Sequence, residues 1–304
     1  MNAEDEKTVI NFDKEVRVNK QGDLYTVPKR KIAQVLALRG NIPALTDPKF
    51  VSKEEGETFL KGDDVVIGLN RGGVIKAYPV KIMRWHQLVN EKIGDELTLV
   101  TYDPISDMAA GYIRKVLNET VTFRVSDKAY NSNPLMEDKE TKTKWSQFMG
   151  EAIFGRLAGQ ALEEFPLIMV SWEGWKRAFP GTKVLSIDTG HKREYDNNVY
   201  ETYYKADYLL FEVENLDKRY NNKKHVYGVK TAGGQKAYPA DLMTKSFRIE
   251  DEIGGIKVKV SVDENGIFSA TLAEDGTPLP VRRPLWFAWA AFYPKTAFYE
   301  AAKM

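Results

Sequence analysis

The sequence contains no cysteine, so disulfides, thiol nucleophiles, thiolate-bound metals and iron–sulfur clusters are excluded. Only three histidines occur (His86, His191 and His225), so a three-histidine metal centre would need all of them. No run approaches the roughly 18 apolar residues of a membrane-spanning helix, and the charged first residues lack the apolar segment of a signal peptide. The GxSxG, HExxH, P-loop, dinucleotide-binding and EF-hand motifs are also missing. We therefore expect no membrane span and no nucleotide cofactor.

The charge of the chain has no strong sign. Its 44 Lys and Arg residues nearly balance 43 Asp and Glu residues, for a net charge of +1, which gives no support for nucleic-acid partners. Hydrophobic residues make up 43% and charged residues 29% of the 304 positions. This is the balance of an ordinary folded protein, and the length suggests two structural units or one large one.

The clearest positive feature is an internal repeat. Residues 65–103 align without a gap with residues 225–263, and residues 172–182 align in the same order with residues 286–296. The second pair of blocks shares two tryptophans, a proline and a threonine. In the first pair, the identical positions of copy 1 are Val66, Gly68, Gly73, Lys76, Ala77, Tyr78, Pro79, Met83, Ile93, Gly94, Val100 and Asp103. Two copies indicate a duplicated unit and not a solenoid, which usually needs three or more.

Each copy predicts a short series of elements. In copy 1, these are a β-hairpin over 65–79 with glycines at its turn, a helix around 80–90 and a strand over 96–102. A later strand and helix carry aromatic residues on one helix face. We therefore predict an α+β fold: an internally duplicated, mixed or antiparallel β-structure with short helices. The two pseudo-repeats would pack as one globule, because either half is small for a core of its own.

We divide the chain into an N-terminal arm and lead-in, a first repeat and a shorter second repeat, at 1–60, 61–205 and 206–304. The arm over 1–24 is polar and reads as a loosely held segment or an edge strand, and residues 29–40 suggest a helix with a basic, solvated face. Edge strands of a duplicated β-unit, together with a free arm, suggest self-association by strand addition.

The first repeat carries an insertion at about 116–165, which we expect to be a largely polar loop and a wall of the functional site. Its amides, hydroxyls and aromatic rings suit a small polar ligand, a glycan or a peptide backbone. The same residues also suit an ordinary, well hydrogen-bonded loop. The candidate ligand-binding residues here are Tyr130, Asn131, Ser132, Trp145 and Gln147.

Two carboxylates mark the end of the strand over 96–102. Asp103 and Asp107 flank Ser106, and His86 lies beside Trp85 on the preceding helix. A carboxylate and an imidazole suit general-base catalysis, and His86 with Asp103 suits one divalent metal. Alternatively, the two aspartates stabilise the turn around Pro104. Asp103 recurs in copy 2 as Asp263, which favours the turn role, whereas Ser246 replaces His86, so the histidine serves only copy 1 or packs in the core.

A third candidate cluster spans residues 189–196. Arg193, with Lys192 beside it, suits an anion. Tyr195 begins a tyrosine-rich stretch that ends at Tyr208 and suits an interface or a sugar platform. A solvated turn and ordinary strand packing are the alternatives for these residues.

Several blocks of the chain resemble the DUF3179 family of uncharacterised bacterial and archaeal proteins. In order, they are IPALTDPKFVS, VIGLNRGGVIKAYP, RWHQLVNEKIGDELTLVTYDPISDMA, YNSNPLMEDKETKTKWSQFMGEAIFG and WEGWKRAFPGTKVLS. The resemblance covers about residues 26–205 and implies a secreted or lipid-anchored protein without a settled activity. Family members usually carry a Cys-Pro-x-Cys motif at the strand end, where this chain has Asp103 and Ser106. Trp85 and His86 are kept, so the walls of that site remain while a thiol role is excluded.

Two functions follow as hypotheses. The first is a non-catalytic, extracytoplasmic binding or structural protein, with a small polar ligand, a glycan or a protein surface as its partner. The alternative is a metal-assisted or general-base hydrolase. There Asp103 and His86 would be base or metal ligand, Asp107 would orient them, and Asn131 and Gln147 would position the substrate.

Overall fold

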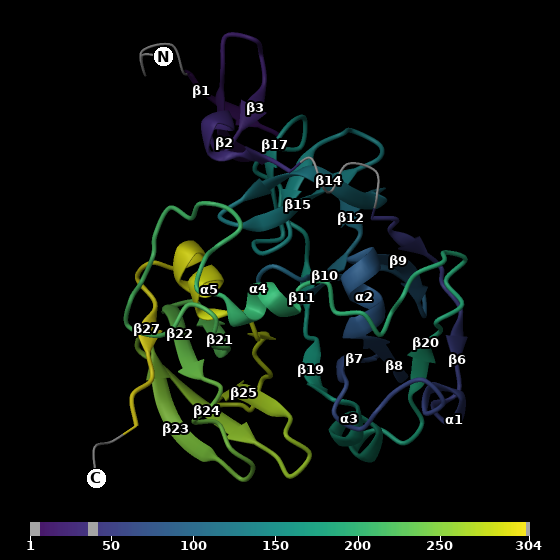
Figure 1. The fold of residues 1–304 in the computed structure, drawn as a ribbon. Coiled ribbons are helices and arrows are strands. Elements are labelled where there is room, and N and C mark those ends of the chain that lie inside the picture. Colours follow the sequence, from purple (N-terminus) through teal and green to yellow (C-terminus); the bar gives the residue numbers. More distant parts are fainter. Residues whose placement is uncertain (1–6, 36–41, 302–304) are drawn as a thin grey trace.

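The computed structural model describes residues 7–35 and 42–301, and these are mostly β-structure (Figure 1). The described helices are all short, in agreement with an α+β fold. They are α1 (Lys53–Gly56), α2 (Val80–His86), α3 (Trp172–Ala178), α4 (Glu201–Lys205) and α5 (Trp286–Phe292), besides a 3-10 turn at Lys29–Lys31. None of the helices in 7–35 and 42–301 is long and apolar enough to cross a membrane.

The hairpin predicted over 65–79 is present and lies in a five-stranded sheet. That sheet runs in the order β19 (Ile168–Ser171), β7 (Val65–Arg71), β8 (Val74–Pro79), β20 (Lys183–Leu185) and β6 (Phe50–Val51). Helix α2 begins directly after Pro79 and ends at His86, which is earlier than predicted. The reason is Gln87, whose φ of 59° is incompatible with a continuing helix.

Strand β10 carries the candidate carboxylate Asp103 at its end. It pairs antiparallel with both neighbours in a second five-stranded sheet. The order of this sheet is β18 (Glu164–Phe165), β11 (Met108–Ile113), β10 (Glu96–Asp103), β9 (Leu88–Ile93) and β5 (Leu45–Thr46). Asp107 lies in the turn between β10 and β11.

The insertion at about 116–165 is not the polar loop expected, because most of it forms a β-meander. Strand β15 is buried along its whole length although it contains Asn133, Glu137 and Asp138. These polar side chains are hydrogen-bonded or ion-paired inside the protein, which makes their burial tolerable. The meander belongs to an eight-stranded sheet, flanked by a separate pair β12 (Lys115–Val116) and β13 (Glu119–Thr120). The sheet order is β1 (Lys7–Asn11), β2 (Lys14–Val18), β3 (Leu24–Tyr25), β17 (Glu151–Phe154), β16 (Lys144–Ser146), β15 (Asn133–Asp138), β14 (Phe123–Tyr130) and β4 (Ala33–Gln34).

The N-terminal arm forms the first strands of this sheet, and β1 is an edge strand. Ile10 on β1 and Phe12 in the turn that follows it are exposed, at 70% and 52%. Self-association through this edge stays a prediction. The helix expected over 29–40 is wrong for its described part. A 3-10 turn and strand β4 occupy that part, because β4 pairs with β14. Residues 36–41 of that expectation, like residues 1–6 of the arm, lie outside the described residues.

The C-terminal part contains two further sheets. One has the order β26 (Val281–Arg282), β21 (Val226–Thr231), β22 (Gly234–Pro239) and β27 (Ala297–Phe298); the other has the order β23 (Arg248–Ile253), β24 (Ile256–Val262) and β25 (Phe268–Leu272). The first pairs antiparallel, antiparallel and parallel, as β19, β7, β8 and β20 do. In both sheets, a helix that begins with tryptophan follows the outer strand.

The residues shared by the two sequence blocks make matching contacts. Lys76 and Tyr78 both donate to the buried carboxylate of Glu91. In the second block, Lys236 Nζ and Tyr238 Oη donate to Asp251, at 2.7 and 2.9 Å. The lysine and the tyrosine of the Lys-Ala-Tyr-Pro motif are thus explained in both blocks by one carboxylate on a strand of another sheet.

The shared glycines and tryptophans also have a common explanation. The ring of Trp175 lies on Gly68, where an added Cβ would approach it to 2.2 Å, and Trp289 lies on Gly228 at the same separation. Both indole N–H groups donate to a threonine, at 2.9 Å each. Glycine is therefore required for close packing at these two positions and not for backbone conformation.

Gly68→Ala is expected to lower the free energy of unfolding by about 3 kcal/mol, because the rigid indole cannot yield to the new methyl group. Urea unfolding checks this value. Gly181→Ala is the matched control, since nothing lies within 4 Å of its added Cβ, and we expect a change within about 1 kcal/mol. Equal effects of the two substitutions would contradict the packing explanation.

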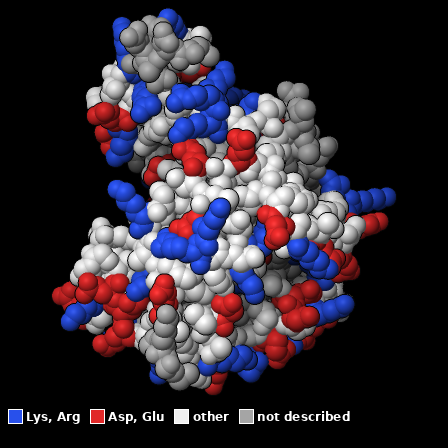
Figure 2. All heavy atoms as spheres, turned by 60° about the vertical axis from the view of Figure 1, so that its left-hand side comes forward, with Lys and Arg blue, Asp and Glu red and all other residues white. Residues whose placement is uncertain are grey.

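The two parts share a hydrophobic core. One cluster of buried side chains includes Leu99 and Phe148 from the N-terminal part and Trp286 and Trp289 from α5. The ring of Phe148 stacks on Phe292 at a centroid distance of 4.2 Å. On the face in Figure 2, acidic and basic side chains are interspersed, and basic ones are more frequent over the upper part and acidic ones over the lower part.

Candidate functional site

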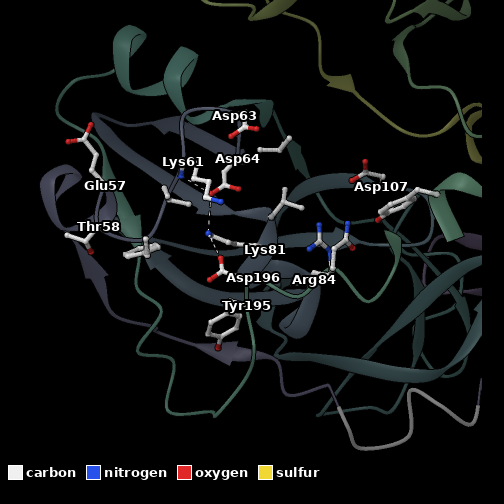
Figure 3. Close-up of a pocket in the computed structure, with 16 residues that line it drawn as sticks. Glu57, Thr58, Lys61, Asp63, Asp64, Lys81, Arg84, Asp107, Tyr195 and Asp196 are labelled. Atoms are coloured by element: carbon white, nitrogen blue, oxygen red, sulfur yellow. Dashed lines mark hydrogen bonds and ion pairs between the residues drawn. The ribbon is translucent and has the colours of Figure 1, made fainter. Parts of the chain in front are cut away.

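A cleft of about 810 Å³ lies beside α2 (Figure 3). We call it the α2 cleft. Its walls come from the segment between α1 and β7, from α2, from the β10–β11 turn and from the chain around α4. The lining residues are Glu57, Thr58, Phe59, Leu60, Lys61, Asp63, Asp64, Val65, Val80, Lys81, Arg84, Asp107, Tyr195, Asp196, Asn198 and Tyr204. Its volume is in the range of about 300–1,000 Å³ that small-molecule sites occupy.

Most charged side chains of the α2 cleft have a partner. Lys81 forms ion pairs with Asp64 at 3.1 Å and with Asp196 at 2.8 Å, and Figure 3 shows it between them. Burial lowers the pKa of Lys81, but the hydrogen bonds and charges of the two carboxylates outweigh burial and raise this pKa above its ordinary value. The ammonium therefore stays charged. Glu57 is paired with Lys176 outside the cleft, at 2.8 Å.

Arg84 has no such partner among the described residues. It is half-buried in the last turn of α2 and forms no hydrogen bond or ion pair with any described residue. Its Nε is buried without an acceptor. Burial raises the pKa of the phenols Tyr200 and Tyr204, and the positive charge of Arg84 opposes this rise. The guanidinium lies at the same end of the cleft as Asp107 (Figure 3).

Asp107 joins the two parts of the chain. Its Oδ1 accepts a hydrogen bond from Tyr102 Oη at 2.6 Å, and its Oδ2 lies 2.7 Å from His225 Nε2. Burial opposes ionisation of this carboxyl, but the hydrogen bond and charge of His225 outweigh it and lower the pKa of Asp107 to about 2. Asp107 is thus a carboxylate at neutral pH, and it orients the imidazole of His225.

His86 is buried, and both ring nitrogens have partners. Nδ1 is 2.8 Å from the carbonyl oxygen of Pro43, and Nε2 is 2.8 Å from Tyr195 Oη. Burial lowers the pKa of His86 to about 4, so the ring is neutral at pH 7. Its contact with Tyr195 fixes one wall of the α2 cleft, since Tyr195 also hydrogen-bonds Thr189 at 2.6 Å.

Asp103 is also fully enclosed by partners. Its carboxylate accepts hydrogen bonds from the backbone N–H groups of Ile105 and Ser106, from the Ser106 hydroxyl and from Asn133 Nδ2. Burial raises its pKa to about 6. Asp263 likewise accepts from the backbone N–H groups that follow its strand, which is the turn role that the sequence recurrence favoured.

His86 and Asp103 share no hydrogen bond. Within 7–35 and 42–301, no three histidine, aspartate or glutamate side chains are grouped as a metal site would require. A divalent ion at His86 would have to displace Pro43 or Tyr195. The metal site at His86 and Asp103 therefore stays a prediction, and a different group of residues faces the cleft.

The predicted ligand-binding residues of the insertion mostly hold the core together. Gln147 accepts a hydrogen bond from Asn133 and donates to Thr101, at 2.9 and 2.8 Å. Trp145 is fully buried and donates to Asp138 at 2.9 Å. Asn131 accepts from the backbone N–H of Glu214 at 2.9 Å.

The other candidates divide between packing and the cleft. Ser132 is buried, and Tyr130 packs edge-on against Phe292. Arg193 lies 5.9 Å over the ring of Trp85 and does not line the α2 cleft. Of the residues proposed from sequence, Asp107 and Tyr195 do line it.

Sequence reasoning did not select Arg84 or His225. A signal for both was present in the comparison of the two repeats. At the offset of 160 positions, Arg84 is matched by Thr244, and His225 is matched by Val65. A polar residue that only one copy has is a candidate for a function that only that copy performs.

A comparison with known families decides the relationship of the chain. Residues 39–274 match the family described as "Protein of unknown function (DUF3179)". The chain belongs to this family. The match extends the resemblance past residue 205 into the second repeat, so it includes both Asp107 and His225 of the DUF3179 protein. No curated protein and no solved structure matches the chain. The function proposed below therefore rests on the geometry of the α2 cleft.

Proposed function

We propose that this DUF3179 protein is a binding protein whose α2 cleft holds a small polar ligand. One observation carries the proposal: Arg84 lines a cleft of about 810 Å³ and has no hydrogen-bond or ion-pair partner among residues 7–35 and 42–301. A guanidinium has five N–H donors, and a half-buried one without an acceptor is available to a ligand. The surrounding carboxylates and phenols supply further hydrogen-bonding groups in the same space.

Filling the cleft is expected to abolish binding. Thr58 is exposed on the cleft wall, so Thr58→Trp places an indole in the ligand space. We expect at least one compound from a panel of sugars, sugar acids, amino acids and nucleosides to raise the unfolding temperature of the full chain by about 5 °C at saturating concentration. Thr58→Trp should remove this rise.

The control for this experiment is Thr8→Trp, because Thr8 is exposed on β1 and does not line the cleft. It should respond to the panel as the unchanged chain does. A compound that stabilises both variants equally would place binding outside the cleft and contradict the proposal.

A second candidate function is acid–base catalysis beside the α2 cleft, which Asp107 lines and His225 does not. The 2.7 Å contact between Asp107 and His225 favours it, because a carboxylate that orients an imidazole is a common arrangement for a general base. This pair replaces Asp103 and His86 as the more favourable candidate, since the latter two are occupied by protein partners. A ligand recovered chemically unchanged after prolonged incubation with the protein would count against catalysis.

We also propose that the two parts arose by internal duplication. The matched strand order, the two Lys–Tyr–carboxylate groups and the two Gly–Trp contacts support this. An extracytoplasmic location is proposed on the family resemblance alone. Fractionation of the source cells tests it, and recovery with the cytoplasmic proteins would contradict it.

A further inference from the structure

The α2 cleft is lined by five carboxylates and three cations, and most of these side chains have partners. Lys81 is neutralised by Asp64 and Asp196, and Asp107 is engaged with His225. Lys61 and Asp63 are both exposed at the cleft and have opposite charges. Arg84 is the half-buried cation of this lining that forms no ion pair with a described residue, and the Asp107 carboxylate lies at the same end of the cleft.

Arginine is well suited to bind a planar anion. Its guanidinium forms two parallel hydrogen bonds with a carboxylate, and such charge-assisted pairs are about twice as strong as neutral ones. Because Arg84 lines the cleft and forms no ion pair with a described residue, a carboxylate bound in the cleft would give its guanidinium a counter-ion. This gain is absent for a neutral ligand.

The rest of the lining limits the ligand to a single negative charge and favours hydroxyl groups. Asp107 lies at the same end of the cleft as Arg84 (Figure 3), so a second negative charge would be repelled. Each carboxylate has about four acceptor positions, whereas Asp107 uses two, for Tyr102 and His225. Asp64 and Asp196 likewise retain positions that hydroxyl donors can fill.

Building on the proposed binding function, we infer that the ligand is a polyhydroxy monocarboxylic acid of the sugar-acid class. Its carboxylate binds Arg84, and its hydroxyl groups donate to the carboxylates of the cleft. The volume of about 810 Å³ accommodates a molecule of this size.

Titration calorimetry of the full chain tests this inference with matched pairs of compounds. D-Glucuronate is compared with D-glucose, and D-galacturonate with D-galactose, so that each pair differs in the carboxylate. D-Glucose 6-phosphate tests a dianion. We expect at least one uronate to bind about tenfold or more tightly than its neutral sugar.

Arg84→Gln should weaken uronate binding about tenfold or more and leave the neutral sugars unaffected, while Arg84→Lys should lie between. The control is Arg248→Gln, which changes an exposed arginine on β23 and should leave all affinities unchanged. Circular dichroism establishes that each variant is folded.

Three results would overturn the inference. They are equal affinity for a uronate and its neutral sugar, tighter binding of the phosphate, and no binding of either uronate below about 10 mM. If one of these occurs while Thr58→Trp still abolishes stabilisation by another compound of the panel, the sugar-acid class is wrong and the binding function stands. If Thr58→Trp has no effect on any compound, the binding function itself fails.

Discussion

Replacing Glu164 by leucine is expected to lower the free energy of unfolding by about 3–5 kcal/mol, because it leaves a buried guanidinium without its counter-ion. Arg282 on β26 is 6% exposed and donates from Nε and Nη2 to the two oxygens of Glu164 on β18, at 3.0 and 2.7 Å. It also donates to the carbonyl oxygen of Phe148 and lies over that ring. The pair therefore joins the N-terminal part of the chain to the C-terminal part.

A double-variant cycle separates the pair from its packing. Glu164→Leu combined with Arg282→Met replaces both charges by apolar groups, and we expect most of the lost stability to return. Glu201→Leu is the matched control, because Glu201 pairs with Lys205 on the surface with both side chains more than half exposed. Its effect should stay below about 1 kcal/mol. If Glu164→Leu lowers the free energy of unfolding by no more than Glu201→Leu does, the buried-pair interpretation is contradicted.

The second large effect is expected at Asp103. Asp103→Ala removes the acceptor for two backbone N–H groups and the Asn133 amide, all of them buried. A buried donor without an acceptor costs about 1–3 kcal/mol, so we expect a loss of about 3–5 kcal/mol at pH 7. Chemical denaturation measures this loss. Asp263→Ala is the comparison, since Asp263 makes the equivalent turn at a more exposed position.

The pH dependence of Asp103 gives a sharper test. Burial raises the pKa of its carboxyl from 3.8 to about 6. Because the folded pKa lies above the unfolded one, this group's contribution to stability is complete below pH 3.8 and is lost as the pH rises through about 6. The difference in unfolding free energy between the unchanged chain and Asp103→Asn should therefore shrink by about 2 kcal/mol between pH 4 and pH 7. A difference that grows with pH would show that the four hydrogen bonds outweigh burial.

Local patterns in the sequence were sufficient for the elements that both repeats share. The β7–β8 hairpin, strand β10 and helix α3 follow from glycine turns, apolar alternation and aromatic spacing. The insertion was misjudged because its polar residues are paired across strands that are distant in sequence. Gln147, for example, donates to Thr101, which lies 46 positions earlier in the chain, and no local pattern reveals such a pairing.

The site was harder to predict than the fold for the same reason. Asp107 was selected because of its place after a strand, but its partner His225 lies 118 positions away. Arg84 was passed over since it stands in the same helix as the more conspicuous Trp85 and His86. What makes Arg84 a candidate is that it has no partner in the described part of the chain, which is a property of the fold and not of the helix sequence.

The most direct measurement of ligand binding at Arg84 is the NMR signal of its Nε–Hε group in the full chain. The signal is assigned by its disappearance in Arg84→Lys, which lacks this nitrogen. During titration with D-glucuronate or D-galacturonate, whichever binds more tightly by calorimetry, the signal should move and reach saturation at the calorimetric dissociation constant. Saturable binding that leaves the Arg84 signal in place would contradict the assignment of the α2 cleft as the functional site.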